Sequence, residues 1–125
     1  MEIVAAVFVE GIDYRQVAGP SMRIDLTGVF FSFAPASYPT EVEPHLVVLV
    51  RCPAGGPPDA TLDVVFLRDG EQVGSSRQTF TIAPGMFGCR LVKSRLSFSE
   101  PGTVEARCTI VESGSSVTVP VTALG

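Results

Sequence analysis

Apolar and polar residues alternate with a period of two along most of this chain, and this feature restricts its fold more than any other. The alternation is clearest near the C-terminus, where apolar residues occupy every second position from Val104 to Ile110. A turn at Ser113-Gly114 then leads into a second alternating run over 117–122. Because successive side chains of a β-strand point to opposite faces, each run predicts a strand with one buried face. No segment repeats its apolar residues at helical spacing over the length of a helix, so we predict an all-β fold.

Strand-like runs separated by turn residues recur along the whole sequence. We expect strands at 3–9, 22–33, 46–50, 61–66, 79–82, 92–98, 104–110 and 116–123. About eight strands without intervening helices predict an immunoglobulin-like antiparallel β-sandwich. A chain of 125 residues, 46% of them hydrophobic, has the size and apolar content of one domain. Residues 1–125 are therefore expected to form a single β-sandwich domain.

Turn residues place the connections between these strands. Residues 3–9 are apolar at every position, which predicts a central strand or one covered on both faces, followed by a loop through Gly19 and Pro20. The segment from Ala34 to Pro44 carries three prolines and is expected to be an ordered surface connection. Asp69-Gly70 between two strand-like runs predicts a hairpin turn.

The phase of the alternation reverses at Gly28. Apolar residues occupy the even positions from Met22 to Leu26 and the odd positions from Val29 to Phe33. An extra residue at a glycine is typical of a β-bulge, which redirects a strand so that one face stays buried. We therefore predict a bulge or bend at Gly28, with both apolar sets on one buried side.

Three segments carry a resemblance to a known group of proteins: MEIVAAVFVEGI at 1–12, LTGVFFSFAPASYP at 26–39 and EPGTVEARCTIVESGSSVTVPV at 100–121. Together they resemble a bacterial family of single-domain proteins of this length. The last segment is shared by many bacterial immunoglobulin-like domains, and the first two are more specific. The resemblance implies an immunoglobulin-like sandwich over the whole chain. It implies no activity and supplies no functional residue.

The three cysteines and the N-terminus bear on the cellular compartment. Glu2 follows Met1, where a secretion signal has basic residues, so a cytoplasmic protein with reduced thiols is expected. Cys52 and Cys108 fall near the ends of the strands that a disulfide joins in immunoglobulin domains, and both face inward by alternation. A disulfide and two buried thiols are both compatible with this placement. The absence of Trp and the odd number of cysteines favour buried thiols.

No pattern of residues indicates catalysis, a cofactor or a metal. Cys89 lies beside Arg90, a setting that favours a lowered thiol pKa, but the only histidine, His45, is distant in sequence and nothing pairs the two. Zinc-ligand spacings, phosphate-binding loops and nucleophile motifs are absent from the sequence. A net charge of −4 with scattered basic residues argues against nucleic acid, and no apolar run is long enough to span a membrane. We therefore expect a protein that is not an enzyme.

Two apolar features lie in expected loops: Tyr38 beside Pro39, and Met86-Phe87 between turn residues. Each either caps an end of the sandwich or contacts a partner, because aromatic and Met side chains are common in interfaces. The leading hypothesis is a non-enzymatic protein-interaction or structural module with a protein partner. The alternative is a small-ligand or carbohydrate-binding domain, although the lack of Trp argues against sugars.

The terminal strand over 116–123 is expected at a sheet edge, because Pro120 lacks the N–H that a central strand would donate. Between Glu112 and the C-terminus the chain has no charged side chain to guard such an edge. A homodimer through this edge, or through the Met86-Phe87 tip, is a further hypothesis.

Overall fold

The computed structural model describes residues 1–19 and 22–125, so the predicted turn residue Pro20 lies outside the described residues. Every regular element in these residues is a β-strand, which confirms the all-β prediction. The described chain has eleven strands rather than about eight. Their bounds are β1 Glu2–Gln16, β2 Met22–Val29, β3 Ser32–Phe33, β4 Thr40–Val42, β5 His45–Arg51, β6 Asp59–Arg68, β7 Glu71–Thr81, β8 Phe87–Lys93, β9 Leu96–Phe98, β10 Gly102–Ile110 and β11 Ser116–Ala123.

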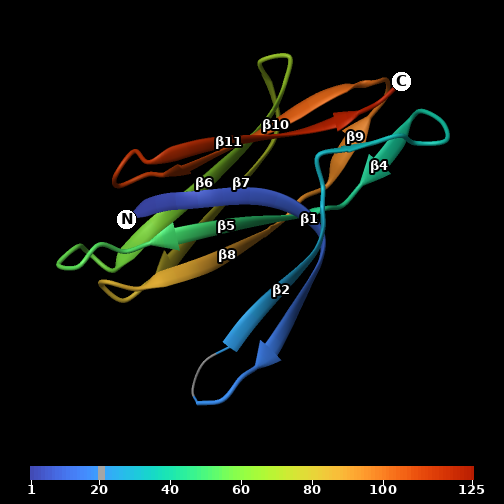
Figure 1. The fold of residues 1–125 in the computed structure, drawn as a ribbon. Helices are drawn as coiled ribbons and strands as arrows, with labels where there is room; N and C mark the ends of the chain where they lie inside the picture. Colours follow the sequence, from blue (N-terminus) through green and yellow to red (C-terminus); the bar gives the residue numbers. More distant parts are fainter. Residues whose placement is uncertain (20–21) are drawn as a thin grey trace.

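The strands form two large sheets and one small one (Figure 1). A four-stranded sheet has the order β2-β1-β5-β8, and a five-stranded sheet has the order β3-β11-β10-β6-β7. Neighbouring strands are antiparallel, except that β3 runs parallel to β11. β4 and β9 form a separate two-stranded sheet. This arrangement is compatible with a β-sandwich.

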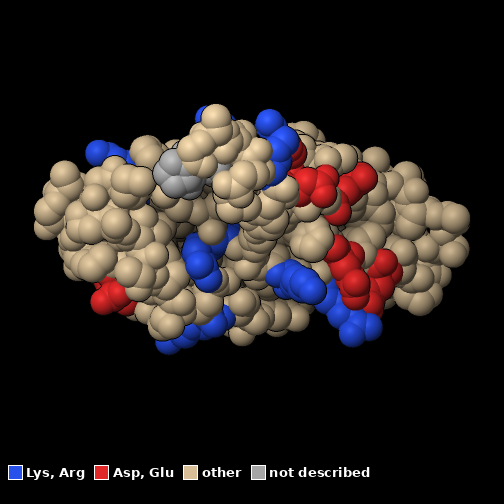
Figure 2. All heavy atoms as spheres, turned by 90° about the horizontal axis from the view of Figure 1, so that it is seen from below, with Lys and Arg blue, Asp and Glu red and all other residues tan. Residues whose placement is uncertain are grey.

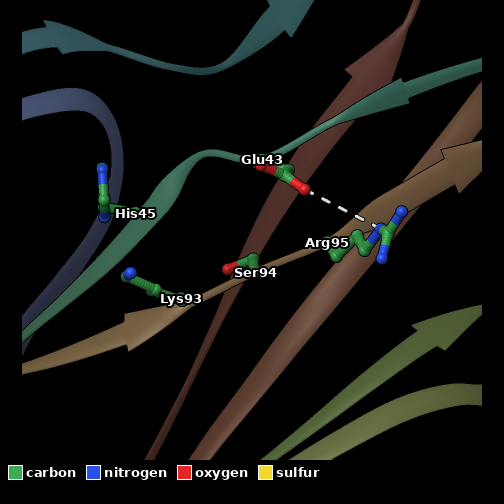
Figure 3. Close-up of a pocket in the computed structure, with 5 residues that line it drawn as sticks. All are labelled: Glu43, His45, Lys93, Ser94 and Arg95. Carbon is green, nitrogen blue, oxygen red and sulfur yellow. Dashed lines mark ion pairs between the residues drawn. The ribbon is translucent and has the colours of Figure 1, made fainter.

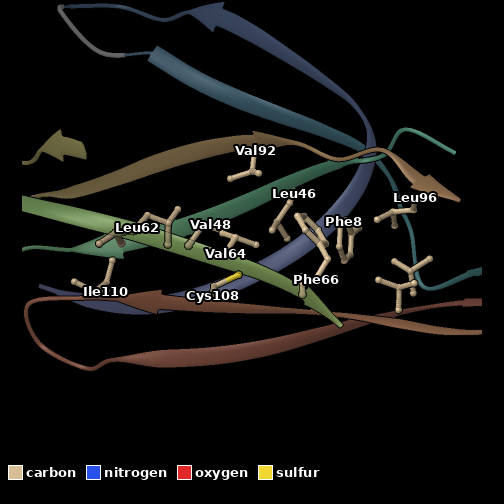
Figure 4. Close-up of a cluster of buried hydrophobic side chains, with 14 of the residues drawn as sticks. Phe8, Leu46, Val48, Leu62, Val64, Phe66, Val92, Leu96, Cys108 and Ile110 are labelled. Atoms are coloured by element: carbon tan, nitrogen blue, oxygen red, sulfur yellow. The ribbon is translucent and has the colours of Figure 1, made fainter. Parts of the chain in front are cut away.

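The two large sheets share one hydrophobic core (Figure 4). Alternate residues of β6 and β10 are buried there, so the predicted inward faces of both strands are confirmed. From the other sheet, β1 supplies Phe8, β5 supplies Leu46, Val48 and Val50, and β8 supplies Val92. Burial of each such side chain is worth roughly 1.5–3 kcal/mol, so this core is the main source of stability.

One seam between the sheets is closed by the side chain of Gln78 on β7. Its amide nitrogen donates to Leu91 O on β8 at 3.3 Å, and its Oε1 accepts from Arg90 Nε at 2.8 Å and from Arg90 Nη2 at 2.6 Å. The Arg90 guanidinium also lies over the Phe80 ring, 5.2 Å from its centroid. One glutamine therefore joins the edge strands of two different sheets.

A second seam is closed by the start of β1 and the turn before β11. Ile3 N donates to Ser115 Oγ at 3.0 Å, and Ser113 Oγ donates to Met1 O at 2.6 Å. β1 and β11 lie side by side along this seam (Figure 1). Side-chain hydrogen bonds thus replace strand pairing where the two sheets meet.

The β6–β7 hairpin turns at Asp69-Gly70, as predicted. Both residues have positive φ angles, 51° for Asp69 and 80° for Gly70, which a two-residue type I′ turn requires. The register shifts beyond Phe66, where Val73 is an extra residue on β7. Such a bulge adds to the twist of this edge strand.

The first strand is longer than predicted. β1 continues beyond Val9 to Gln16, with residues 2–9 paired to β5 and residues 9–16 paired to β2. It is a central strand, which was one of the two predicted alternatives. Val4 is nevertheless exposed, so the apolar residues of β1 are not covered on both faces.

Two predicted connections differ from the structure. The segment 34–44 is more than a surface connection, because it contains β4, which pairs with β9. The single strand predicted over 92–98 is two strands, β8 and β9, in different sheets. The chain changes sheet at Ser94, whose N–H donates to Pro44 O at 3.3 Å. Alternation does not reveal this break, because alternate residues stay buried on both sides of it.

The predicted bulge at Gly28 is wrong. The β1–β2 register is unbroken at this position, since Gly11 faces Thr27 and Val9 faces Val29, so no extra residue is absorbed. Gly28 instead has a positive φ of 66°, which distorts the backbone without changing the register. The two apolar sets do not share a buried side, because among the described strands β2 pairs with β1 alone and most of the large side chains in these sets are exposed.

The terminal strand is not an edge strand over its whole length. β3 pairs with its last residues, and Thr122 N donates to Phe31 O at 3.0 Å while Leu124 N donates to Phe33 O at 2.9 Å. The nitrogen of Pro120, two residues before Thr122, faces the same side and therefore points away from β10. The missing N–H of Pro120 therefore removes no hydrogen bond to β10. This explains why a proline is tolerated in this strand.

Candidate functional site

The second half of β1 and all of β2 form a hairpin that projects from the two large sheets (Figure 1). We call residues 10–16 and 22–29 the arm. The two strands pair only with each other here, because β5 pairs with β1 only up to Val9. Each face of the arm can therefore be described from its register alone.

One face of the arm is apolar and exposed. Tyr14 faces Ile24, Ile12 faces Leu26, and Gln16 faces Met22, and directly facing residues of antiparallel strands lie on the same side. The exposed fraction is 56% for Tyr14, 54% for Met22 and 38% for both Ile24 and Leu26. These four apolar side chains are neighbours on one face, and contiguous exposed apolar patches, unlike single exposed residues, often mark interaction sites.

The opposite face of the arm is charged. Asp13 faces Asp25 and Arg15 faces Arg23, so like charges stand directly across from each other. Only the diagonal pair is joined, by Arg15 Nε to Asp25 Oδ2 at 2.8 Å and Arg15 Nη2 to Asp25 Oδ1 at 3.1 Å. The hydrogen bond from Arg15 lowers the pKa of Asp25 below its usual value. The arm is therefore amphipathic, with its apolar side facing solvent.

Charged side chains elsewhere are dispersed. On the face drawn in Figure 2, acidic side chains gather in one region, whereas Lys and Arg are scattered among uncharged residues. Basic side chains form no continuous area in that view.

A polar hollow of about 400 Å³ lies where the chain passes between sheets, and it is lined by Glu43, His45, Lys93, Ser94 and Arg95 (Figure 3). Ser94 is 4% exposed, and its Oγ has no hydrogen-bond partner among residues 1–19 and 22–125. Arg95 Nε lies 3.8 Å from Glu43 Oε1. His45 and Lys93 face each other across β5 and β8. The hollow thus offers cationic groups and a carboxylate to a small polar molecule, although Arg95 Nε is already bonded to Glu41 Oε1 at 2.5 Å and Ser94 Oγ is itself buried.

The residues predicted to contact a partner are not brought together. Tyr38 is half-buried against the core, and its hydroxyl donates to Leu124 O at 2.5 Å. Met86 and Phe87 are 59% and 64% exposed, in and just after the turn between β7 and β8. That turn and the loop before β4 lie at opposite ends of the molecule (Figure 1).

The exposed apolar face of the arm differs from the prediction. Alternation usually marks a half-buried strand, and it therefore predicts a buried side for Met22, Ile24 and Leu26. The available signal was the position of the charges. Asp and Arg alternate with apolar residues on both β1 and β2, so a hairpin of these strands has one apolar and one charged face.

The cysteines form no reactive site. Cys52 and Cys108 are buried in the core, and all three thiols are free. Burial raises the pKa of Cys89 more than Arg90 lowers it, so the neighbouring Arg90 does not produce a lowered thiol pKa. Cys89 faces a residue of β5 four positions beyond His45, which separates the two side chains by roughly 13 Å along the strand.

Searches for related proteins return no match: no family model fits the chain, and no curated protein is similar to it. The resemblance to a bacterial family therefore has no support from these comparisons. Within residues 1–19 and 22–125, no helix is long and apolar enough to cross a membrane. In the same residues, no group of His, Cys, Asp and Glu is suited to hold a metal ion.

Proposed function

We propose that this chain is a non-enzymatic protein-interaction module that contacts its partner through the apolar face of the arm. The observation that carries the proposal is the exposure of Tyr14, Met22, Ile24 and Leu26 on one side of a projecting hairpin. Burying such a face in a complex is favourable at about 25 cal/mol per Å² of apolar surface. Tyr and Met are also among the residues enriched in interfaces. A cytoplasmic location belongs to the same proposal.

We also infer an immunoglobulin-like topology for the scaffold that carries the arm. Immunoglobulin domains place strands A, B and E in one sheet and strands G, F and C in the other, with C′ added in variable domains. Here β1-β5-β8 follows the order A-B-E, and β11-β10-β6-β7 follows the order G-F-C-C′. Cys108 then lies on the strand that corresponds to F, and Cys52 directly follows the strand that corresponds to B. An experimental structure with another strand order would contradict this inference.

The interaction is tested by pulldown from the native cell followed by mass spectrometry. The bait is the full chain, compared with Ile24→Asp on the arm and with Val73→Asp as a matched control. Val73 is an exposed apolar residue of β7, distant from the arm in sequence and sheet. We expect the protein partner to be lost with Ile24→Asp and retained with Val73→Asp. A partner retained equally by both variants would contradict a role for the arm.

The polar hollow supports a second candidate, the binding of a small polar ligand. The observation in its favour is the buried hydroxyl of Ser94, which has no partner although buried polar groups are almost always hydrogen-bonded. Small carboxylates and monosaccharides are suitable probes, because the hollow holds both donors and an acceptor. A probe that binds there should raise the Tm of the wild type but not that of Ser94→Ala. Equal shifts in both proteins would exclude this site.

A further inference from the structure

We propose that β2 pairs with β2 of a second copy of this chain, antiparallel and about a two-fold axis at Ile24. The inference rests on the proposed function, because it names a partner for the same arm. It is carried by the open edge of β2 and by the order of charges along that strand.

The edge of β2 is open. β2 ends the four-stranded sheet, and its outer side pairs with no other strand of residues 1–19 and 22–125. Open edges pair readily with other chains unless charged side chains, Pro or a bulge guard them. β2 contains no Pro and its register with β1 has no bulge, and its two charged residues, Arg23 and Asp25, have opposite signs. The other long edges are less open, since Gln78 joins β7 to β8 and β3 covers the end of β11.

The sequence of β2 is complementary to itself about Ile24. In an antiparallel pair centred there, Arg23 of each copy faces Asp25 of the other, and Met22 faces Leu26. Opposite charges and apolar pairs at facing positions stabilise a sheet, whereas like charges destabilise it. Centring the pair on Arg23 or on Asp25 would set like charges face to face. The order of charges therefore favours one register.

Within a single chain these charges are incompletely paired. Arg23 faces Arg15, and Asp25 faces Asp13, so both facing positions repel. Asp25 is paired with Arg15, but Arg23 has no carboxylate partner in the part of the chain that the structure describes. A second copy supplies that carboxylate from its own Asp25.

Pairing also enlarges the apolar face of the arm. Facing residues lie on the same side of a sheet, so Met22, Ile24 and Leu26 of both copies share one four-stranded surface. The two edges bury less than the roughly 1,200 Å² of a stable interface. We therefore expect a weak dimer whose population rises with protein concentration.

The test uses two charge reversals in the full chain, Arg23→Asp and Asp25→Arg. Each variant alone places like charges at both facing positions of a homodimer, whereas a mixture of the two places opposite charges at both. Neither change should unfold the arm. Arg23→Asp sets a carboxylate opposite Arg15, and Asp25→Arg sets a guanidinium opposite Asp13, so each removes a like-charge pair within the chain. Asp25→Arg also removes the Arg15–Asp25 ion pair, which is exposed and therefore contributes little to stability.

Sedimentation equilibrium over a concentration series measures the outcome. We expect the wild type to dimerise, each reversal to weaken the dimer about tenfold, and the equimolar mixture to recover to within about threefold of the wild type. The proposal is overturned if the wild type stays monomeric, if both variants dimerise as the wild type does, or if the mixture does not recover. Unchanged dimers would point to another surface, such as the Met86-Phe87 tip.

The pulldown separates this proposal from the proposed function. If the wild type is a monomer but Ile24→Asp still loses a protein partner, self-pairing is overturned and the interaction module stands. If Ile24→Asp changes neither the partners nor the association, both proposals are overturned.

Discussion

Gln78 does more for this fold than its surface position on an edge strand indicates. Its amide group donates to the Leu91 carbonyl and accepts from the Arg90 guanidinium, which lies over the Phe80 ring, so three groups depend on one side chain. A buried polar group that loses its partner costs about 1–3 kcal/mol. The contribution of Gln78 is therefore comparable with that of a core side chain.

We expect Gln78→Ala to lower the free energy of unfolding by about 1–3 kcal/mol, because it leaves the Leu91 carbonyl and the Arg90 guanidinium without this hydrogen-bond partner. Urea denaturation measures this change. Gln72→Ala is the matched control, since Gln72 lies on the same strand and is exposed. It should change stability by less than about 0.5 kcal/mol. A Gln78 variant as stable as the control would show that the seam does not depend on this side chain.

Cys108 makes stability depend on pH in the alkaline range. Burial raises the pKa of its thiol from the ordinary 9.0 to about 11. The folded state keeps the proton while the unfolded state loses it above about pH 9, so stability is full below pH 9 and falls as the pH rises to 11. We expect the wild type to lose up to about 2–3 kcal/mol more than Cys108→Ala between pH 8 and pH 11.

This difference is measured by urea unfolding of both proteins under reducing conditions at a series of pH values. The comparison cancels the other groups that titrate in this range, because the two proteins share them. Parallel pH profiles would contradict a raised pKa for Cys108.

At the scale of elements, the arm and the core strands look alike in sequence and differ in environment. β2 and β10 both alternate, but alternate residues of β10 are buried, whereas β2 is almost wholly exposed. The difference arises because β10 lies between β11 and β6, facing the other large sheet, whereas β2 pairs with β1 alone. Alternation shows that a strand has two unlike faces. It does not show which face meets the core.

We expect the apolar face of the arm to contribute little to folding. The combined change Tyr14→Ser and Met22→Ser should lower the free energy of unfolding by less than about 1 kcal/mol, because both residues are more than half exposed. Leu62→Ala in the core should cost about 2–5 kcal/mol. Thermal or urea unfolding compares the two. An arm variant as unstable as the core variant would show that this face packs against the rest of the chain.

At the scale of the whole molecule, one core joins the two large sheets and side-chain hydrogen bonds close their seams. Both Cys52 and Cys108 belong to that core. Their redox state therefore concerns the whole fold rather than a local site.

We expect three free thiols when the protein is isolated from its native cell under non-reducing conditions and denatured in a thiol reagent. The proposed cytoplasmic location would keep the cysteines reduced, and the sequence has no Trp to pack against a bridge. Cys52→Ala is the control and should give two. One free thiol in the wild type would instead indicate a bridge and an oxidising compartment.

Much of the architecture was determined by the sequence itself. The all-β class, the inward residues of β6 and β10, and the turn at Asp69-Gly70 all follow from local rules. Those rules act over a few residues, because side-chain alternation and turn conformation depend on neighbouring φ and ψ angles. The loop residues Tyr38, Met86 and Phe87 were also visible in the sequence, although only the last two are largely exposed.

Only the tertiary structure decided where each strand pairs and which faces remain bare. The exposure of Ile24, the change of sheet at Ser94 and the pairing of β3 with β11 each depend on strands distant in sequence. The sequence pattern is the same whether an apolar face meets a core, a partner or water. Which of these an apolar face meets depends on the free energy of packing whole sheets together. The sequence of one strand does not determine that free energy.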